Sequence, residues 1–346
     1  MKRQFCCLLA LALLMPAFTF AADTVAFTDS AGRTVQLPAN IERIAPSGPV
    51  AQMVLMSIAP ERFVGLATAL DRGEAEYMAN VPDLPVIGQL YGTRGDLNLE
   101  ELARLDPQVI IDVGEPKDNV AEDMDALQEQ LGIPCVHITM HLKDAGDAYR
   151  KLGGLLGAQE KAEALAAYCD EVFARAEDIM QQVGDKRVSL LYSLGDAGLN
   201  VIAQGSFHAE VIDLVAANAA VVDNPTSKGT GNEVDMEQLY LWDPDFVVFA
   251  PGSVYSKVGD DPLWQELTAI REGRYAQAPQ RPYNWMGFPA SIQRLLGMIW
   301  LQKILYPDVV TYDLQAEINR YYELFYGQPL TAEQYDTLMA GALPAK

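Results

Sequence analysis

Several residues that could recognise a ligand stand where predicted strands end. Ser47 and Gly48 follow a short apolar strand and precede Pro49, which suits the first position of a helix. Free amide groups at that helix start would favour an anionic or oxygen-rich ligand, although an ordinary helix start explains the pattern equally well. Because ligands of α/β sheets meet the loops at the carboxyl ends of the strands, we expect the loop with Tyr91 and Arg94 to face the same cleft.

The second half of the chain carries a comparable set of polar and aromatic candidates. They are Tyr192, Ser206, Phe207, Tyr255, Asn284, Trp285 and Met286. The last three open a segment with Gly287 that ends before Pro289, and an exposed aromatic loop of this kind can lie against a large planar or apolar ligand. Arg94, Arg281 and Arg294 could bind anionic groups through paired hydrogen bonds, although a single arginine is more often a solvated surface residue.

Signatures of covalent chemistry are missing from the sequence. It has no His-Glu-x-x-His motif, no nucleophile elbow, no Gly-Lys-Ser/Thr phosphate loop and no dinucleotide-binding glycine fingerprint. A site for a bare transition metal needs several His and carboxylate ligands, whereas only His137, His141 and His208 exist. We therefore expect binding and delivery without a cofactor or resident metal, and we keep an exported enzyme as the alternative of a different class.

The N-terminus predicts export from the cytoplasm. Lys2 and Arg3 precede an apolar run from Phe5 to Phe18, and Thr19-Phe20-Ala21 is an acceptable cleavage site. The run is too short for a permanent membrane span, so a membrane anchor is the weaker interpretation. Cys6 and Cys7 lie at the front of the run and not behind it, where a lipid-modified cysteine would stand. We expect residues 1–21 to be a signal peptide and the mature chain to be free in the periplasm.

The charge balance limits the partners of the mature protein. The net charge is −22, and loss of Lys2 and Arg3 with the signal peptide removes two positive charges and gives −24. So acidic a protein should avoid nucleic acid and anionic membrane surfaces. Cys135 and Cys169 remain after processing, and their predicted positions in a strand and a helix favour two separate buried thiols over a disulfide.

Apolar strands alternate with helical segments along the chain after a predicted hairpin at 25–37. This alternation, with short connections, indicates an α/β fold with mainly parallel sheets and two Rossmann-like lobes. We expect an N-terminal lobe over 22–145, a connecting segment over 146–185 and a C-terminal lobe with further helices over 186–346. The connection contains a predicted helix at 159–182, about 36 Å long at 1.5 Å per residue, that would join the lobes as a stiff strut.

One short pattern occurs once in each half of the chain. In 98–107 and again in 235–244, a capping residue opens a helix with Glu or Gln three residues later, and Asp-Pro ends it before an apolar strand. Proline cannot continue the helix, so it turns the chain into the strand. The two lobes are therefore predicted to be copies of one design.

With these features the mature chain resembles the periplasmic binding proteins of ABC importers for iron–siderophore, haem, cobalamin and related ligands. The resemblance rests on the two repeated units, the strut helix, residues 261–267, Arg274-Tyr275, Trp300-Leu301 and residues 305–307. A related branch that binds molybdate and tungstate shares much of the C-terminal pattern.

The resemblance implies a ligand cleft between the lobes, with the strut at its back and small closing movements. It also implies that Glu100 and Glu237 dock onto arginines of the permease. A helix-dipole role explains first-turn acids as well, and the two roles are compatible. We expect a monomeric importer component that captures an iron chelate of the siderophore, haem or corrinoid type, with molybdate or tungstate as the alternative ligand.

Overall fold

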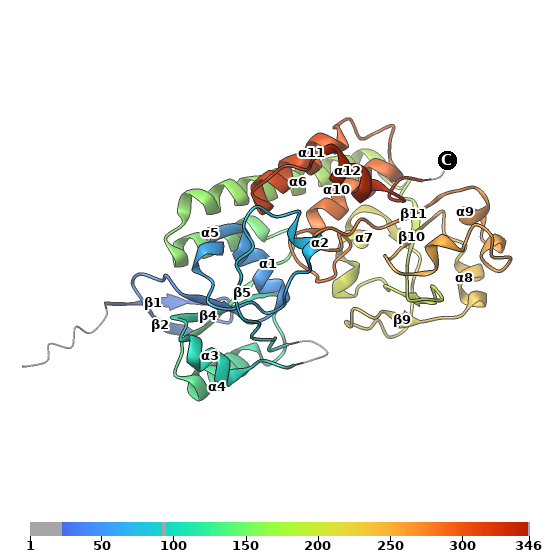
Figure 1. Ribbon diagram of the computed structural model, residues 1–346. Coiled ribbons are helices and arrows are strands. Elements are labelled where there is room, and N and C mark those ends of the chain that lie inside the picture. The colour runs from blue at the N-terminus through green and yellow to red at the C-terminus, as the bar shows by residue number, and fades with distance from the viewer. Residues whose placement is uncertain (1–22, 92–94, 345–346) are drawn as a thin grey trace, which may run out of the picture.

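The computed structural model describes residues 23–91 and 95–344, and it has two α/β lobes joined by a long helix (Figure 1). The expected signal peptide and Arg94 lie outside the described residues. Within those ranges, no helix has the length and apolar character of a membrane span. We call the part built on strands β3 to β5 the N-lobe and the part built on β6 to β11 the C-lobe.

The N-lobe opens with the predicted hairpin, in which β1 (Thr24–Thr28) pairs antiparallel with β2 (Thr34–Pro38). Its main sheet is parallel, in the order β3 (Ile44–Pro46), β4 (Val109–Gly114) and β5 (Cys135–Thr139). Nearly every residue of these three strands is buried, as expected for strands covered on both faces. Two isolated parallel bridges, Ile44 with Phe63 and Leu66 with Val86, continue this part of the lobe.

The C-lobe contains a six-stranded mixed sheet. Its strands are β6 (Ser189–Leu194), β7 (Asn200–Val201), β8 (Ala217–Asn218), β9 (Asn232–Glu233), β10 (Phe246–Phe249) and β11 (Tyr275–Gln277). They run in the order β11-β10-β6-β7-β9, with β8 also paired to β6. The pairings among β11, β10, β6 and β8 are parallel, whereas β7 pairs antiparallel with both β6 and β9. The prediction of mainly parallel sheets therefore holds for the part of this sheet formed by β11, β10, β6 and β8.

Helices cover both sheets. They are α1 (Pro49–Ile58), α2 (Arg72–Ala75), α3 (Leu99–Leu105), α4 (Val120–Leu131), α5 (Ala145–Leu156), α6 (Gln159–Val183), α7 (Glu210–Val215), α8 (Met236–Trp242), α9 (Thr268–Arg271), α10 (Arg294–Leu305), α11 (Leu314–Tyr321) and α12 (Ala332–Met339). Figure 1 shows α6 and α10 to α12 along one side of the molecule, behind both lobes.

The predicted strut is confirmed as α6, which has 25 residues and packs closely on α5. Polar contacts fasten the C-terminal helices to it. Arg320 of α11 makes a two-bonded ion pair with Glu171, with both distances 2.6 Å, and Gln302 of α10 donates to the carbonyl of Ala176 at 3.0 Å. The strut is therefore held along its length by helices from the end of the chain.

The chain returns to the N-lobe after α11. The amide of Ala79 donates to the carbonyl of Tyr326 at 2.8 Å, and Gln328 donates to the carbonyl of Glu76 at 2.9 Å. Phe325 stacks on Tyr321 with ring centres 4.2 Å apart and an angle of 8°. Residues 322–328, assigned from the sequence to the C-terminal lobe, thus pack on the first lobe.

The repeated unit is reproduced in atomic detail. Asn98 accepts from the third helical amide of α3 at 3.0 Å, and Asp235 does the same for α8 at 2.8 Å. Both helices have seven residues and end at an aspartate with left-handed backbone, Asp106 at φ 46° and Asp243 at φ 32°. Within the described residues, no other non-glycine residue has a positive φ. Both predicted N-caps are confirmed.

Both remaining cysteine thiols are buried and unpaired, as the separate-thiol interpretation predicts. Cys135 lies in β5 and Cys169 in α6, so their side chains belong to different layers of the fold. Burial raises the pKa of Cys135 to about 12. Both cysteines therefore remain protonated thiols with a packing role.

Candidate functional site

The lobes meet where the carboxyl ends of β3, β4 and β5 face two C-lobe segments, 205–210 and 287–294. The amide of Leu142 donates to a carboxylate oxygen of Glu210 at 2.9 Å, and Ser291 donates to the carbonyl of Val50 at 3.3 Å. A cavity of about 10 Å³ remains at this junction, which is close to the room that one water molecule needs. It is lined by Val50, Gly114, Met140, His141, Leu142, Ala145, Ala290, Ser291, Ile292 and Arg294.

Arg294, at the start of α10, is the buried cation of this junction, with 2% of its surface exposed. Its Nη1 atom lies 2.7 Å from Glu210 and donates to the carbonyl of Phe207 at 3.2 Å, and its Nε atom donates to the carbonyl of Ser291 at 3.1 Å. The Phe207 ring lies 4.7 Å from the guanidinium carbon. Burial lowers the pKa of Arg294, but an arginine in a protein stays charged.

Glu210, the first residue of α7, connects the two lobes. One carboxylate oxygen accepts from the N-lobe amide of Leu142, while the other pairs with Arg294 of the C-lobe. Phe207 extends the same contact, because its ring lies 6.3 Å from the ring of His141 and 5.9 Å from the ammonium of Lys117. Charged and aromatic groups of both lobes thus converge on one point.

A chain of buried polar groups forms the N-lobe wall. Ser47 donates its hydroxyl proton to Asp112, whose other oxygen lies 2.6 Å from Nδ1 of His137. The second ring nitrogen of His137 lies 3.1 Å from the hydroxyl of Thr139. Asp112 stands between Ser47 and His137, so the histidine is not placed to take the serine proton as in a nucleophilic triad. Since Ser47 gives its hydroxyl proton to Asp112, that proton is not free for a ligand.

Two predicted site residues carry enclosed hydroxyls that are unsatisfied within the described part of the chain. They are Tyr91, on the N-lobe loop, and Ser206, which lies directly before Phe207. Burial, the nearby charge of Asp112 and the neighbouring carboxylate of Asp123 raise the pKa of Tyr91, so its phenol keeps its proton at neutral pH. Buried hydroxyls normally find a partner, and both groups are therefore candidates to donate to a ligand.

The start of α1 supplies two further donors. Gly48 is its N-cap with extended backbone, Pro49 follows, and the amide of Gln52 is already bonded to the carbonyl of Gly48 at 2.9 Å. Helix geometry therefore leaves the amides of Val50 and Ala51 without a partner inside the helix. Val50 lines the junction cavity, so this helix start points at the same place as Arg294.

The expectation of an exposed aromatic loop is wrong. Trp285 and Met286 are fully buried, and Asn284 is 5% exposed. The loop packs against α10 because Gly297 has no side chain: a Cβ there would lie 2.4 Å from the carbonyl oxygen of Trp285. Asn284 fastens the loop from within by accepting from the amide of Met286 at 2.7 Å.

The other predicted residues divide between the junction and the core. Tyr192 is fully buried, and Asn284 donates to its hydroxyl at 3.3 Å. Tyr255 lies away from the junction, with its ring 6.1 Å from Phe249 and its hydroxyl 3.2 Å from the carbonyl of Gly341. The structure brings Ser47, Gly48, Ser206 and Phe207 near the interface and leaves Tyr255 in a separate cluster.

Two contributors were not selected from the sequence, Glu210 and His141 as a wall residue, whereas Phe288 belongs to the predicted 284–288 segment. The ring of Phe288 stacks on His208 at 5.0 Å with an angle of 13°. Nothing local marks Glu210, which reads as an ordinary acid at a helix start. Its importance comes from contacts with residues 68 positions earlier and 84 positions later, Leu142 and Arg294.

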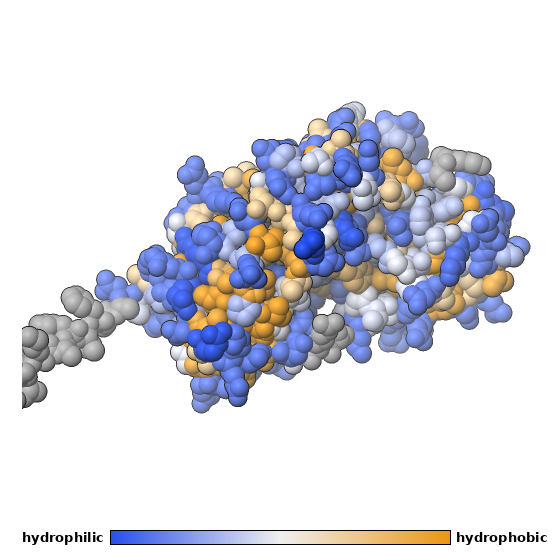
Figure 2. Space-filling view, in the orientation of Figure 1, coloured by the Kyte–Doolittle hydropathy of each residue, from blue (hydrophilic) through white to orange (hydrophobic). Residues whose placement is uncertain are grey.

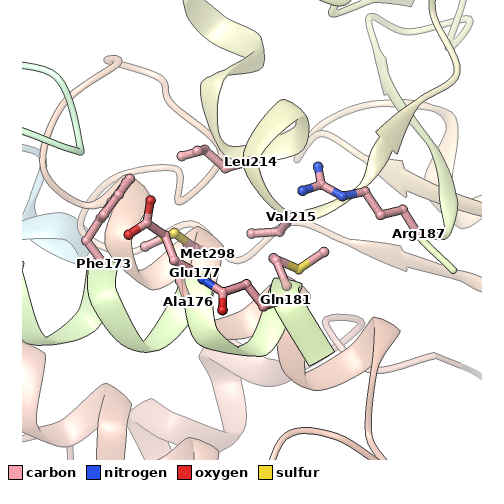
Figure 3. Close-up of a pocket in the computed structure, with 9 residues that line it drawn as sticks. Phe173, Ala176, Glu177, Gln181, Arg187, Leu214, Val215 and Met298 are labelled. Atoms are coloured by element: carbon pink, nitrogen blue, oxygen red, sulfur yellow. The ribbon is translucent and has the colours of Figure 1, made fainter. Parts of the chain in front are cut away.

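A second cavity of about 270 Å³ lies between α6, α7 and α10, apart from the residues of the junction. Figure 3 shows side chains of α6, among them Phe173 and Glu177, facing Leu214 and Val215 of α7. Met298, one turn after Arg294 in α10, lines it as well. The helices that carry the Glu210–Arg294 pair thus border free space one turn further on.

Residues 50–282 match a known family described as periplasmic binding protein. The chain belongs to this family. It is 24% identical to the molybdate-binding protein MolA of Haemophilus influenzae, covering 92% of this chain and 95% of that protein. A solved ABC transporter solute-binding protein from Sulfurospirillum deleyianum is 25% identical, with a TM-score of 0.83 over 91% of this chain and 99% of that one.

Structures of relatives with different stated ligands share the fold. MolA bound to molybdate gives a TM-score of 0.68 at 19% identity, over 89% of this chain and 99% of that one. The catecholate-siderophore-binding protein VctP of Vibrio cholerae gives 0.57 at 16% identity, over 80% of this chain and 96% of that one. The predicted family and the two-lobed α/β fold are confirmed, while these likenesses leave the ligand open.

Proposed function

We propose that this protein is the binding component of an ABC importer and that it captures a small oxyanion of the molybdate or tungstate type. The observation that carries the proposal is Arg294, a buried cation at the junction of the lobes. Its Nε and Nη1 atoms are occupied, whereas no described residue accepts from Nη2. A tetrahedral oxyanion can accept from that nitrogen and from the enclosed hydroxyls of Ser206 and Tyr91.

Space and helix geometry support the same ligand class. The free amides at the start of α1 favour negative charge. The small junction cavity suits a compact ligand better than a siderophore complex or haem. The sequence-based preference for a bulky chelate rested on an exposed aromatic loop, and Trp285 and Met286 are buried. The relationship to MolA adds support for the oxyanion.

Calorimetric titration of the mature protein tests the ligand. We expect saturable, micromolar or tighter binding of molybdate and tungstate, and weak or no binding of sulfate, haem, cobalamin and a ferric catecholate. Arg294→Lys keeps the charge but loses the forked donor, and it should weaken molybdate binding about tenfold. Binding of the ferric chelate with no response to molybdate would reject the oxyanion and restore the chelate proposal.

In this proposal, delivery of the ligand to the permease depends on one exposed glutamate in each repeated unit. Glu100 and Glu237 lie in the first turns of α3 and α8, exposed to solvent at the same position of the two copies. We propose that both dock onto arginines of the permease, after residues 1–21 direct export of a monomer to the periplasm. The variant Glu100→Ala/Glu237→Ala should bind ligand normally and lose transport; unchanged transport would reject the docking role. N-terminal sequencing of the periplasmic protein tests cleavage after Ala21.

A further inference from the structure

The two proposed docking helices differ at the exposed position one turn after the glutamate. Leu102 and Leu239 are the buried residues of α3 and α8, and Glu100 and Glu237 are exposed in both. One turn after the glutamate, the N-lobe has Arg104 and the C-lobe has Leu241. On a helix, positions four apart share a face, so each of these residues lies beside its glutamate.

Leu241 is the most exposed large hydrophobic residue of the described chain, at 79%. A second such residue, Leu263 at 59%, is held next to the same helix, because the hydroxyl of Tyr240 donates to its carbonyl at 2.9 Å. Figure 2 shows apolar surface on the C-lobe near the position that α8 has in Figure 1. An apolar contact area thus adjoins Glu237.

The N-lobe copy presents a polar pair at the corresponding place. Arg104 donates to both carboxylate oxygens of Glu101, at 2.9 Å and 2.6 Å. The ion pair raises the pKa of Arg104 and lowers that of Glu101, so both stay charged and neutralise each other. The C-lobe has Gln238 in place of Glu101 and Leu241 in place of Arg104, so the corresponding ion pair cannot form there.

We propose that Leu241, with Leu263, is an apolar docking contact for the permease that only the C-lobe provides. The proposal rests on the docking role proposed above for Glu100 and Glu237. The partner surface would offer a cation to each glutamate, but an apolar side chain only at the C-lobe end. The binding protein then has unequal ends, and its C-lobe end contributes more to the affinity for the permease than its N-lobe end.

The test compares mirror-image substitutions in the full mature protein. Leu241→Arg gives the C-lobe the side chain of the N-lobe, and Arg104→Leu does the reverse. Val25→Arg is the control, because Val25 is 50% exposed on β1, at the end of the molecule far from α8 (Figure 1). The probe is right-side-out inner-membrane vesicles from the source bacterium lacking this protein, and the measurement is the dissociation constant of labelled variants.

We expect Leu241→Arg to weaken binding to the vesicles about tenfold, and Arg104→Leu and Val25→Arg to change it less than about twofold. A photoactivatable residue at position 241 should form a covalent adduct with a permease subunit, identified by mass spectrometry, and one at position 25 should not.

The Glu100→Ala/Glu237→Ala variant separates the two proposals. If that variant loses binding while Leu241→Arg binds like Val25→Arg, the apolar contact is rejected and docking by the glutamates stands. Equal losses for Leu241→Arg and Arg104→Leu would likewise reject an unequal surface.

Discussion

The two walls of the cleft use their polar groups in opposite ways. The N-lobe wall bonds its own groups together, from Ser47 through Asp112 and His137 to Thr139. The C-lobe wall contains two hydrogen-bond donors that have no acceptor among the described residues, the hydroxyl of Ser206 and one nitrogen of Arg294. A satisfied network holds a shape, whereas unsatisfied buried donors attract a ligand. The comparison assigns positioning to this N-lobe network and the charged ligand bond to the C-lobe wall, while Tyr91 and the start of α1 add neutral donors from the N-lobe side.

Removal of the cation should have the largest effect. Arg294→Gln takes away the charge that faces the ligand, and it leaves Glu210 partly buried without its partner. We expect molybdate binding to fall about a hundredfold and the free energy of unfolding to fall by about 3 kcal/mol. Calorimetric titration and urea unfolding measure the two quantities. Tight molybdate binding by a folded Arg294→Gln protein would place the anion elsewhere.

The packing beneath the C-lobe wall can be broken separately. Gly297→Ala would place a methyl group 2.4 Å from the carbonyl oxygen of Trp285, and we expect a loss of about 2 kcal/mol in urea unfolding. Gly154→Ala is the matched control, because Gly154 lies in the last turn of α5 and a Cβ there meets nothing within 4 Å. The control should gain about 0.5–1 kcal/mol from its higher helix propensity. If both substitutions changed the free energy of unfolding in the same direction, the packing of Trp285 would not depend on the missing side chain at Gly297.

The N-lobe network should affect stability more than binding. Asp112→Asn keeps the shape of the side chain but offers a single acceptor to Ser47 and His137. We expect a loss of about 1–2 kcal/mol in the free energy of unfolding, since one buried donor loses its partner. The dissociation constant for molybdate should change less than about threefold. A loss of binding as large as that of Arg294→Gln would erase the difference between the walls.

The smallest expected effect concerns pH. Burial lowers the pKa of His208 below its usual 6.5, assisted by the charges of Arg294 and Lys117. The unfolded chain therefore takes up a proton at a higher pH than the folded protein, and stability falls as pH drops from about 6.5 towards the lower folded pKa. The His208→Gln variant should lose less stability between pH 7.5 and 5.5 than the unaltered protein does. An identical pH dependence in urea unfolding would contradict this.

Patterns that are local in sequence predicted the fold well. The strut followed from apolar spacing, and the repeated unit followed from a capping residue and an Asp-Pro step, which the structure realises as two left-handed aspartates. Residues near the junction were found where strand ends marked them, as for Ser47 and Gly48. These signals need no knowledge of distant neighbours.

The failures concern residues whose surroundings are set by distant segments. Whether Trp285 is exposed depends on Gly297 and the packing of α10, and Tyr255 lies against the strand that carries Phe249. The pairing of Glu210 with Arg294 arises only when α7 and α10 pack together. Nothing in the type or spacing of these residues distinguishes them from surface charges before that packing exists.

The return of residues 322–328 to the N-lobe has a consequence for the order of folding. The amide of Ala79 donates to the carbonyl of Tyr326, and the carbonyl of Glu76 accepts from the side chain of Gln328. The rings of Tyr149 and Phe325 lie 6.0 Å apart. Because synthesis proceeds from the N-terminus, the first lobe cannot complete its core until residues 322–328 have been synthesised. The lobes are thus coupled in folding, and the finished structure forms only after the whole chain is available.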